Sequence, residues 1–176
     1  MFFIVALGVL WLIHGYVAWR TIPAMGLSFS YTLLVYITVF IFSLLPVVPI
    51  VLRMSGNESK IIDKFSLLGY TSLGFFTLSF VFLFTKDFII QFISIFSNLV
   101  DTEQPIDNSK RDFIKKSITL GIIGISGTAT GFGFYNSRKG PSVIKHDIFL
   151  ESLPESFNNF TIAQISDLHV GPTIKR

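Results

Sequence analysis

The chain has 176 residues, of which 51% are apolar, 14% are charged and 20 are phenylalanine. Soluble domains carry charge on about a quarter of their residues, so this composition indicates a membrane protein. The formal net charge is +3, and the basic residues cluster beside apolar runs instead of alternating with aromatic residues, which argues against nucleic acid as a partner. The chain contains no cysteine, which excludes disulfides, thiolate catalysis and cysteine-based zinc sites within it.

Three long apolar runs in the first hundred residues predict three membrane-spanning helices, because a helix needs about 20 apolar residues to cross the hydrocarbon. The runs are Phe2–Trp19, Phe29–Leu52 and Phe65–Thr85. Pro46 and Pro49 fall near the end of the second run, where a kink costs least. His14 lies within the first run and raises the hypothesis of an ion path, but no span contains a second charge, so a packed histidine is favoured.

The segment Phe88–Val100 is too short to cross a membrane, and its polar residues recur every three to four positions. This pattern predicts an amphipathic helix that lies in the interface, so that residues 1–100 form a three-span membrane domain. The alternative is that the segment extends the third spanning helix beyond a snorkelling Lys86. Residues 101–116 are polar, include Pro105, and are expected to be a linker.

A fourth spanning helix is predicted over residues 117–137, which carry no charge and are rich in glycine. Small residues at this density are typical of helices that pack closely in a membrane. The stretch "SKRDFIKKS" comes directly before it. This stretch resembles the twin-arginine export signal, Ser/Thr-Arg-Arg-x-Phe-Leu-Lys, with Lys110 in place of the first arginine and Ile114 in place of leucine. The resemblance implies twin-arginine or other membrane export machinery as a partner.

An ordinary stop of positive charge at a cytoplasmic helix end is the alternative explanation of this cluster. The lysine and arginine residues of the loops divide equally between the two sides, so their count does not fix the orientation. The dense cluster before the fourth span favours an arrangement in which the N-terminus and everything after Ser137 lie outside the cytoplasm.

From residue 138 the composition becomes that of a soluble domain, with two strand candidates, "PSVIKHDIFL" and "FTIAQISDLH", separated by the turn-like "ESLPESFNN". The second candidate is apolar on both faces, as in a strand buried inside a larger sheet. One pair of strands could not bury it, so the rest of that sheet is expected beyond Arg176.

Two residues at the end of the second candidate strand suggest a metal site. Asp167 and His169 are separated by one residue, so on an extended strand both side chains point to the same face, where they could bind one ion. Gly171 and Pro172 then allow the chain to turn away. A bare Asp-x-His triplet also arises by chance at solvated strand ends. The surrounding sequence therefore decides whether this triplet is read as a metal site.

The context is "FTIAQISDLHVG", which resembles the first motif of the calcineurin-like metallophosphoesterases, a hydrophobic strand that ends in Ser-Asp-x-His-x-Gly. The resemblance extends from about Val143 through Gly171 and includes the "LP" at Leu153. It implies that Asp167 and His169 bind one metal of a two-metal centre. It also implies a fold of two packed sheets flanked by helices, and hydrolysis of phosphate esters by a metal-activated hydroxide.

The later motifs of that family, Gly-Asp-x-x-Asp, Gly-Asn-His-Asp/Glu and Gly-His-x-His, do not occur in this chain. The resemblance therefore implies that this chain is the N-terminal fragment of a membrane-anchored phosphoesterase of the bacterial type and is inactive alone. It implies no catalytic residue in the fragment beyond the two metal ligands, and no other cofactor-binding residue. The longer parent would bind two divalent ions, with Mn, Fe or Zn all suited to histidine and carboxylate ligands.

The expected fold is thus an α-helical integral membrane domain with about four transmembrane helices, followed over residues 138–176 by the truncated first strands of an α/β four-layer metallophosphoesterase domain. The expected partners are the lipid bilayer and a phosphoester substrate, with lipid-linked phosphoesters among the candidates. The expected location is the inner (plasma) membrane, multi-pass, with the catalytic domain on the extracytoplasmic side. The alternative function is a non-enzymatic membrane protein whose four spans form a packing, binding or small-solute module.

Overall fold

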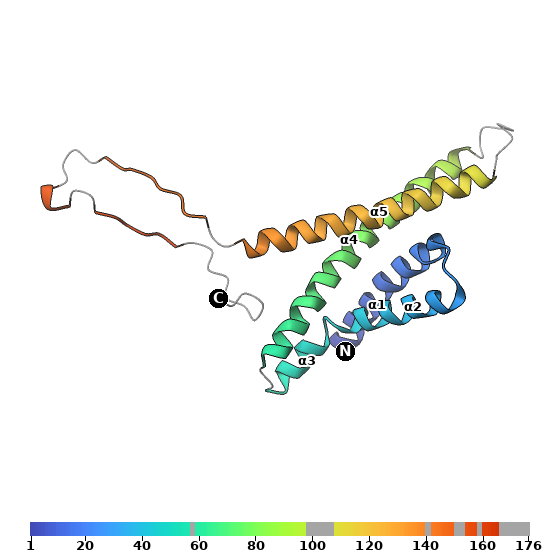
Figure 1. Cartoon of the computed structure of the whole chain (residues 1–176), viewed down its shortest axis with the longest axis horizontal. Coiled ribbons are helices and arrows are strands. Elements are labelled where there is room, and N and C mark those ends of the chain that lie inside the picture. Colours follow the sequence, from blue (N-terminus) through green and yellow to red (C-terminus); the bar gives the residue numbers. More distant parts are fainter. Residues whose placement is uncertain (57–58, 98–107, 140–141, 150–153, 158–159, 166–176) are drawn as a thin grey trace.

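A computed structural model describes residues 1–56, 59–97, 108–139, 142–149, 154–157 and 160–165. The described residues form long helices with an extended tail (Figure 1). In chain order, the elements are α1 (Phe2–Thr21), the 3-10 helix η1 (Pro23–Met25), α2 (Phe29–Leu44), α3 (Val48–Met54), α4 (Lys60–Ser97), α5 (Asn108–Arg138) and the 3-10 helix η2 (Glu155–Phe157).

Four helical segments are long and apolar enough to cross a membrane, which confirms the prediction of about four transmembrane helices. They are Ile4–Met25, Phe29–Met54, Lys60–Ile95 and Ser109–Arg138. Large apolar side chains face outward along all of them, with Leu12 73% and Ile125 61% exposed. An apolar surface of this extent is compatible with lipid as the surrounding solvent.

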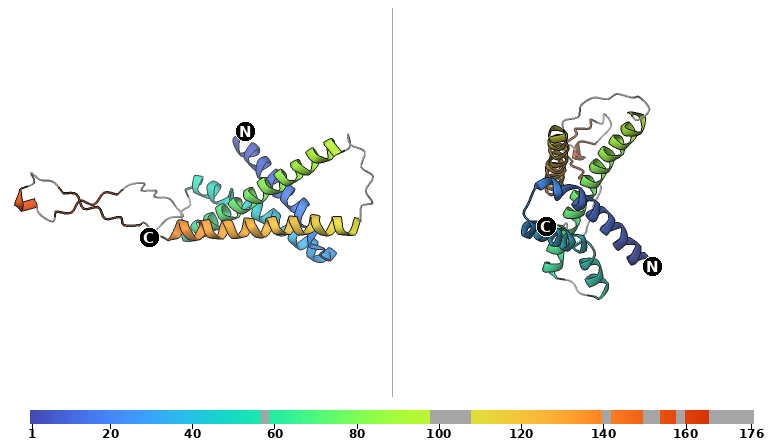
Figure 2. Two further views of the ribbon diagram at one scale, coloured as in Figure 1. Left: turned by 90° about the horizontal axis from the view of Figure 1, so that it is seen from above. Right: turned by 90° about the vertical axis from the view of Figure 1, so that its right-hand side faces the viewer.

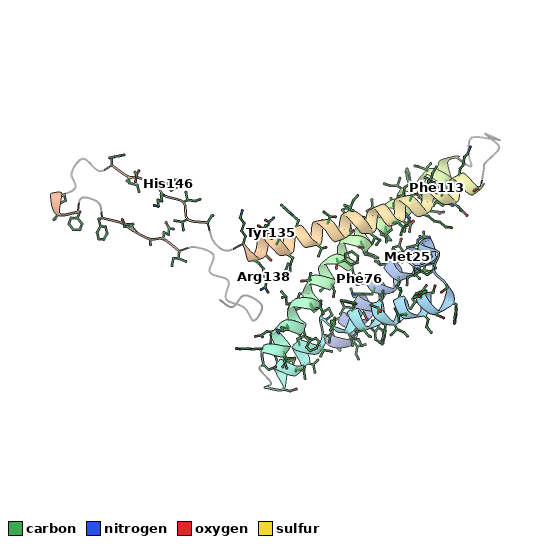
Figure 3. All side chains as sticks on the ribbon, viewed as in Figure 1. Met25, Phe76, Phe113, Tyr135, Arg138 and His146 are labelled. Atoms are coloured by element: carbon green, nitrogen blue, oxygen red, sulfur yellow. The ribbon has the colours of Figure 1, made fainter. Side chains whose placement is uncertain are left out.

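The long helix α4 holds the bundle together, because it packs against α1, α2, α3 and α5. Figures 1 and 2 show α1 and α2 on one side of α4 and α5 crossing it on another. The buried apolar cluster between α1 and α4 is small and consists of Val17 on α1 with Phe76 and Leu83 on α4. Figure 3 marks Phe76 on the part of α4 beside α1. Most of the apolar surface is thus left to the lipid.

The second predicted span is broken into α2 and α3 at the two prolines. α2 ends at Leu44, and Pro46 cannot donate the backbone hydrogen bond that would continue it. The chain turns and resumes as α3, with Pro49 in its first turn, where the missing N–H costs nothing. Arg53 of α3 then pairs with Asp63 of α4 at 2.8 Å and ties this hairpin together.

Helix α4 continues without a break through Lys86 to Ser97. Residues 88–97 therefore extend the third span, as the alternative for this segment proposed, and do not begin a separate helix. A charged pair at Lys86 and Asp87 does not end a helix, because both residues tolerate helical geometry. Helix α5 begins at Asn108, so the basic cluster at residues 110–116 forms its first turns and is not part of a linker.

The glycines of α5 do not mediate the close helix packing that their density predicted. A Cβ built at Gly121, Gly124, Gly131 or Gly133 would meet nothing within 4 Å, and at Gly127 it would meet only the Phe75 ring at 3.8 Å. Within the described residues, these glycines therefore leave open faces on α5.

The described tail residues are extended but form no strands. Residues 142–149 and 160–165 run out from the end of α5 and return, as Figure 1 shows. Their apolar side chains are exposed, with Phe149 at 93% and Ile162 at 82%, and Figure 3 shows His146 on the outgoing segment, away from the helices. A strand needs a partner for its backbone ladder, and no neighbouring sheet lies against these residues in the described structure.

Among the described glycines, Gly69 of α4 lies closest to a neighbouring backbone, and this contact predicts the effect of adding one methyl group. A Cβ there would lie 2.6 Å from the carbonyl oxygen of Leu45 and 2.9 Å from the nitrogen of Pro46. Both are backbone atoms, so Gly69→Ala should push α4 from the α2–α3 break and destabilise the fold by about 1–3 kcal/mol. The measurement is thermal unfolding in detergent, followed by the fluorescence of the two tryptophans.

Gly74→Ala is the matched control, because the same helix offers open space at that position. It should leave the midpoint unchanged or raise it slightly, since alanine favours a helix over glycine. Equal midpoints for the two variants would contradict the close approach at Gly69.

Candidate functional site

The two metal ligands that the sequence predicts, Asp167 and His169, lie outside the described residues. Among the described residues, no group of three or more His, Asp or Glu side chains could hold a metal ion. The described backbone ends at Ile165, two residues before the first predicted ligand. The metal motif therefore stays a prediction, and the described residues offer a different polar site.

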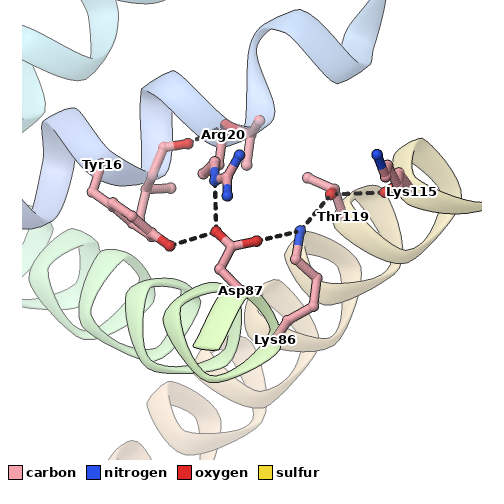
Figure 4. Close-up of polar contacts among 8 residues, drawn as sticks. Tyr16, Arg20, Lys86, Asp87, Lys115 and Thr119 are labelled. Carbon is pink, nitrogen blue, oxygen red and sulfur yellow. Dashed lines mark hydrogen bonds and ion pairs between the residues drawn. The ribbon is translucent and has the colours of Figure 1, made fainter. Parts of the chain in front are cut away.

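That site centres on the carboxylate of Asp87, near the end of the membrane-spanning part of α4 (Figure 4). One carboxylate oxygen accepts hydrogen bonds from the hydroxyl of Tyr16 and from Nε of Arg20, each at 2.5 Å. The other oxygen lies 3.3 Å from Nζ of Lys86. Asp87 is only 16% exposed, and both of its oxygens have partners.

The network reaches a third helix through Lys86. Its Nζ donates to Oγ1 of Thr119 on α5 at 3.1 Å, and Thr119 donates in turn to the carbonyl of Lys115 at 2.9 Å. Thr119 is buried, so this threonine is part of the contact between α4 and α5. Three helices far apart in sequence thus meet at one carboxylate, as Figure 4 shows.

Helix geometry explains why these side chains converge. Tyr16 and Arg20 are four residues apart and therefore share one face of α1. Arg20 also stacks over the ring of Trp19, with its Cζ 4.6 Å from the ring centroid, and this pair suits a membrane interface. In the sequence, Arg20 directly follows the first apolar run and Asp87 comes just after the third, and no local pattern connects the two residues. The missed signal is that alternate spans run in the same direction, so opposite charges at the ends of the first and third spans reach one interface.

A cavity of about 300 Å³ lies beside this network, between η1, the end of α1, α4 and the first turns of α5. Its polar lining consists of Arg20, Lys86, Asp87, Lys115, Lys116 and Thr119. Four basic side chains thus face one carboxylate, and the lining has a formal excess of positive charge. Chemically, the cavity is suited to an anion.

His14 is packed, as the sequence analysis favoured, and it does not join the polar network. It is 1% exposed, its Nδ1 lies 2.8 Å from the carbonyl oxygen of Leu10, and its ring lies on that of Phe76 with centroids 4.2 Å apart. Its Nε2 is buried without a hydrogen-bond partner in the part of the chain that the structure describes. The histidine fills the contact between α1 and α4.

Comparison with known proteins finds one informative similarity. The chain is 28% identical over 112 residues to "Transmembrane protein with metallophosphoesterase domain" of Danio rerio, a match that covers 63% of this chain and 24% of the relative. The chain therefore spans about a quarter of the length of that relative. No family model and no solved structure matches the chain.

The matched stretch is much longer than residues 139–176, so it includes residues of the membrane helices. This distant similarity supports a relationship to the metallophosphoesterase family, in agreement with the motif, and a membrane location. It does not address the metal ions, the substrate or the side of the membrane.

The Asp87 network predicts a marked loss of stability in Asp87→Ala. Arg20 and Lys86 would keep their charges at membrane depth without the carboxylate that pairs with both. Because Arg20 is partly exposed, we expect a loss of about 1–3 kcal/mol rather than the full cost of a buried unpaired charge. Thermal unfolding in detergent measures this loss.

A double variant, Arg20→Met with Asp87→Leu, provides the control, since it removes Arg20 together with its carboxylate and leaves only Lys86 without an ion-pair partner. It should recover part of the stability that Asp87→Ala loses. If the double variant loses as much stability as the single variants Arg20→Met and Asp87→Leu lose together, or more, the pairing of Arg20 with Asp87 is not what stabilises this end of the bundle.

Proposed function

We propose that this chain is the membrane anchor and first metal-ligand motif of a longer, metal-dependent phosphoesterase. The observation that carries the proposal is the similarity to a membrane protein with a metallophosphoesterase domain, together with the "FTIAQISDLHVG" motif. The four apolar helices fit the role of the anchor.

Asp167 and His169 are the residues that we assign to the metal. A carboxylate oxygen and an imidazole nitrogen form a donor pair suited to Mn, Fe or Zn. Two ligands do not complete a site, so the remaining ligands of a two-metal centre would come from the rest of the longer protein. When bound, the two divalent ions would supply a hydroxide nucleophile at neutral pH and stabilise negative charge on the phosphoryl oxygens.

The arrangement of α5 supports a catalytic domain held close to the membrane. The tail begins directly after Arg138, at the end of α5 opposite to the basic cluster. We propose that this tail emerges on the extracytoplasmic side of the plasma membrane. The basic cluster at residues 110–116 would then lie on the cytoplasmic side, where a twin-arginine or other export system would recognise it. Phosphoesters at the membrane surface, lipid-linked ones included, are the proposed substrates.

The orientation can be tested with single cysteines, because the chain has none of its own. Ser59→Cys and Ser142→Cys should both react with a membrane-impermeant thiol reagent in intact cells. Ser28→Cys, in the turn between α1 and α2, is the matched control and should react only after the membrane is permeabilised. Labelling of Ser28→Cys in intact cells together with protection of Ser142→Cys would reverse the proposed orientation.

The catalytic assignment predicts loss of activity in the longer protein when either ligand is replaced. Asp167→Ala and His169→Ala should each lower hydrolysis of an aryl phosphodiester by about 100-fold or more, since losing a ligand weakens the site that generates hydroxide. Expression and membrane insertion should stay near wild type, because a ligand at a strand end contributes little to a core. Added Mn should restore His169→Ala more than Asp167→Ala, which also loses a negative charge facing the cation.

Two results would contradict the proposal. One is full hydrolysis by a folded Asp167→Ala protein. The other is a natural protein in which no Gly-Asp-x-x-Asp motif follows Arg176, which would favour the non-enzymatic membrane module instead.

A further inference from the structure

The cavity between α1, α4 and α5 carries positive charge that the described residues do not balance. Among the lining residues that the structure describes, Asp87 is the only carboxylate, and both of its oxygens are already shared among Tyr16, Arg20 and Lys86. Lys115 and Lys116 line the same cavity, and neither side chain forms an ion pair with a described residue. The site is therefore open to a further anion.

The cavity lies where a lipid headgroup would be found. Arg20 is near the end of the spanning segment Ile4–Met25, and its neighbour Trp19 is 59% exposed, as expected of an aromatic side chain at the interface. Pro23, Ala24 and Ile90 provide an apolar part of the lining next to the basic part. Basic and apolar walls together match the junction between a phosphate headgroup and its acyl chains.

Size and donor chemistry fit a phosphate group. The volume of about 300 Å³ is roughly ten times the share of one water molecule in the liquid. Asp87 uses Nε of Arg20, and the guanidinium has further N–H donors that can bind phosphate oxygens. Lys115 and Lys116 add two ammonium groups from the first turns of α5.

We propose that this cavity binds a phosphate group, carried by an anionic phospholipid of the leaflet in which α1 and the spanning part of α4 end. The lipid would complete the charge balance of the Asp87 network and join α5 to α1 and α4 at this interface.

This site is separate from the proposed phosphoesterase centre. Thr119 and Arg138 are about 28 Å apart along α5 at 1.5 Å per residue, close to the roughly 30 Å of hydrocarbon. The tail that carries the metal motif begins beyond Arg138, so the lipid would bind at the opposite membrane face. The inference does not depend on the proposed function, and its test measures binding and not hydrolysis.

The test compares lipid binding by the purified chain in a neutral detergent, using native mass spectrometry with phosphatidylglycerol and with phosphatidylcholine as probes. The pocket variant is Lys115→Gln with Lys116→Gln. The matched control is Lys60→Gln with Lys64→Gln, which removes the same charge from exposed positions in the first turns of α4, at the other end of the bundle. Both lysine pairs are exposed, so neither variant should disturb folding.

The wild type should retain one phosphatidylglycerol in preference to phosphatidylcholine. The pocket variant should weaken this binding by about tenfold or more, given the usual attraction of two lysines to anionic lipid, while the control changes it less than about threefold. An equal loss of phosphatidylglycerol binding in both variants would show that the lipid is attracted by general positive charge and would overturn the proposal.

Inorganic phosphate distinguishes the two sources of the phosphate group. At matched ionic strength, millimolar phosphate should neither displace the lipid nor raise the thermal midpoint of lipid-free protein. A different result would assign the site to a soluble anion in place of a lipid. In that case, phosphate would raise the thermal midpoint of the wild type but not of the Lys115→Gln, Lys116→Gln variant, and the protein would show no preference for phosphatidylglycerol.

Discussion

The bundle depends on one partly buried carboxylate, Asp87, whose charge is satisfied by side chains of its neighbours. Asp87 accepts from Tyr16 and Arg20 of α1 and is paired with Lys86, which also bonds to α5. In lipid the hydrophobic effect does not bring helices together, so helix association relies on polar contacts and close packing. The apolar core is correspondingly small, and the charges at one end set how α1, α4 and α5 align.

At the opposite end of the bundle, α4 is positioned by close backbone contact together with one salt bridge. There α4 presents Gly69 to the break between α2 and α3, so that backbone touches backbone. The salt bridge from Arg53 to Asp63 closes the same hairpin. The two ends thus fix α4 by different means, and α5 is held mainly at the charged end and along its contact with α4.

Hydropathy was sufficient to predict the spanning helices, because the need for about 20 apolar residues is a local property of the chain. Helix ends were harder to predict. The third apolar run ends at Thr85, which suggested a boundary before Lys86, yet α4 continues to Ser97, since charge alone does not break a helix. The Asp87 network joins residues 67 and 71 positions apart, and no local pattern encodes such a contact. The expected strands need sheet partners that the described residues do not provide, and the metal ligands Asp167 and His169 lie outside them.

The unbroken length of α4 has a mechanical consequence. Its 38 residues extend about 57 Å, nearly twice the roughly 30 Å of a hydrocarbon core, and the side chains of its last turns, such as Phe92 and Ile93, are apolar and more than half exposed. Even at the steepest tilts seen for spanning helices, part of such a rod must leave the hydrocarbon. Because α4 is one unbroken helix, we expect a thinner or thicker bilayer to change the inclination of its whole length. Hydrophobic mismatch at one leaflet is thereby transmitted to every helix that packs on α4, which makes this anchor sensitive to the thickness of the membrane around it.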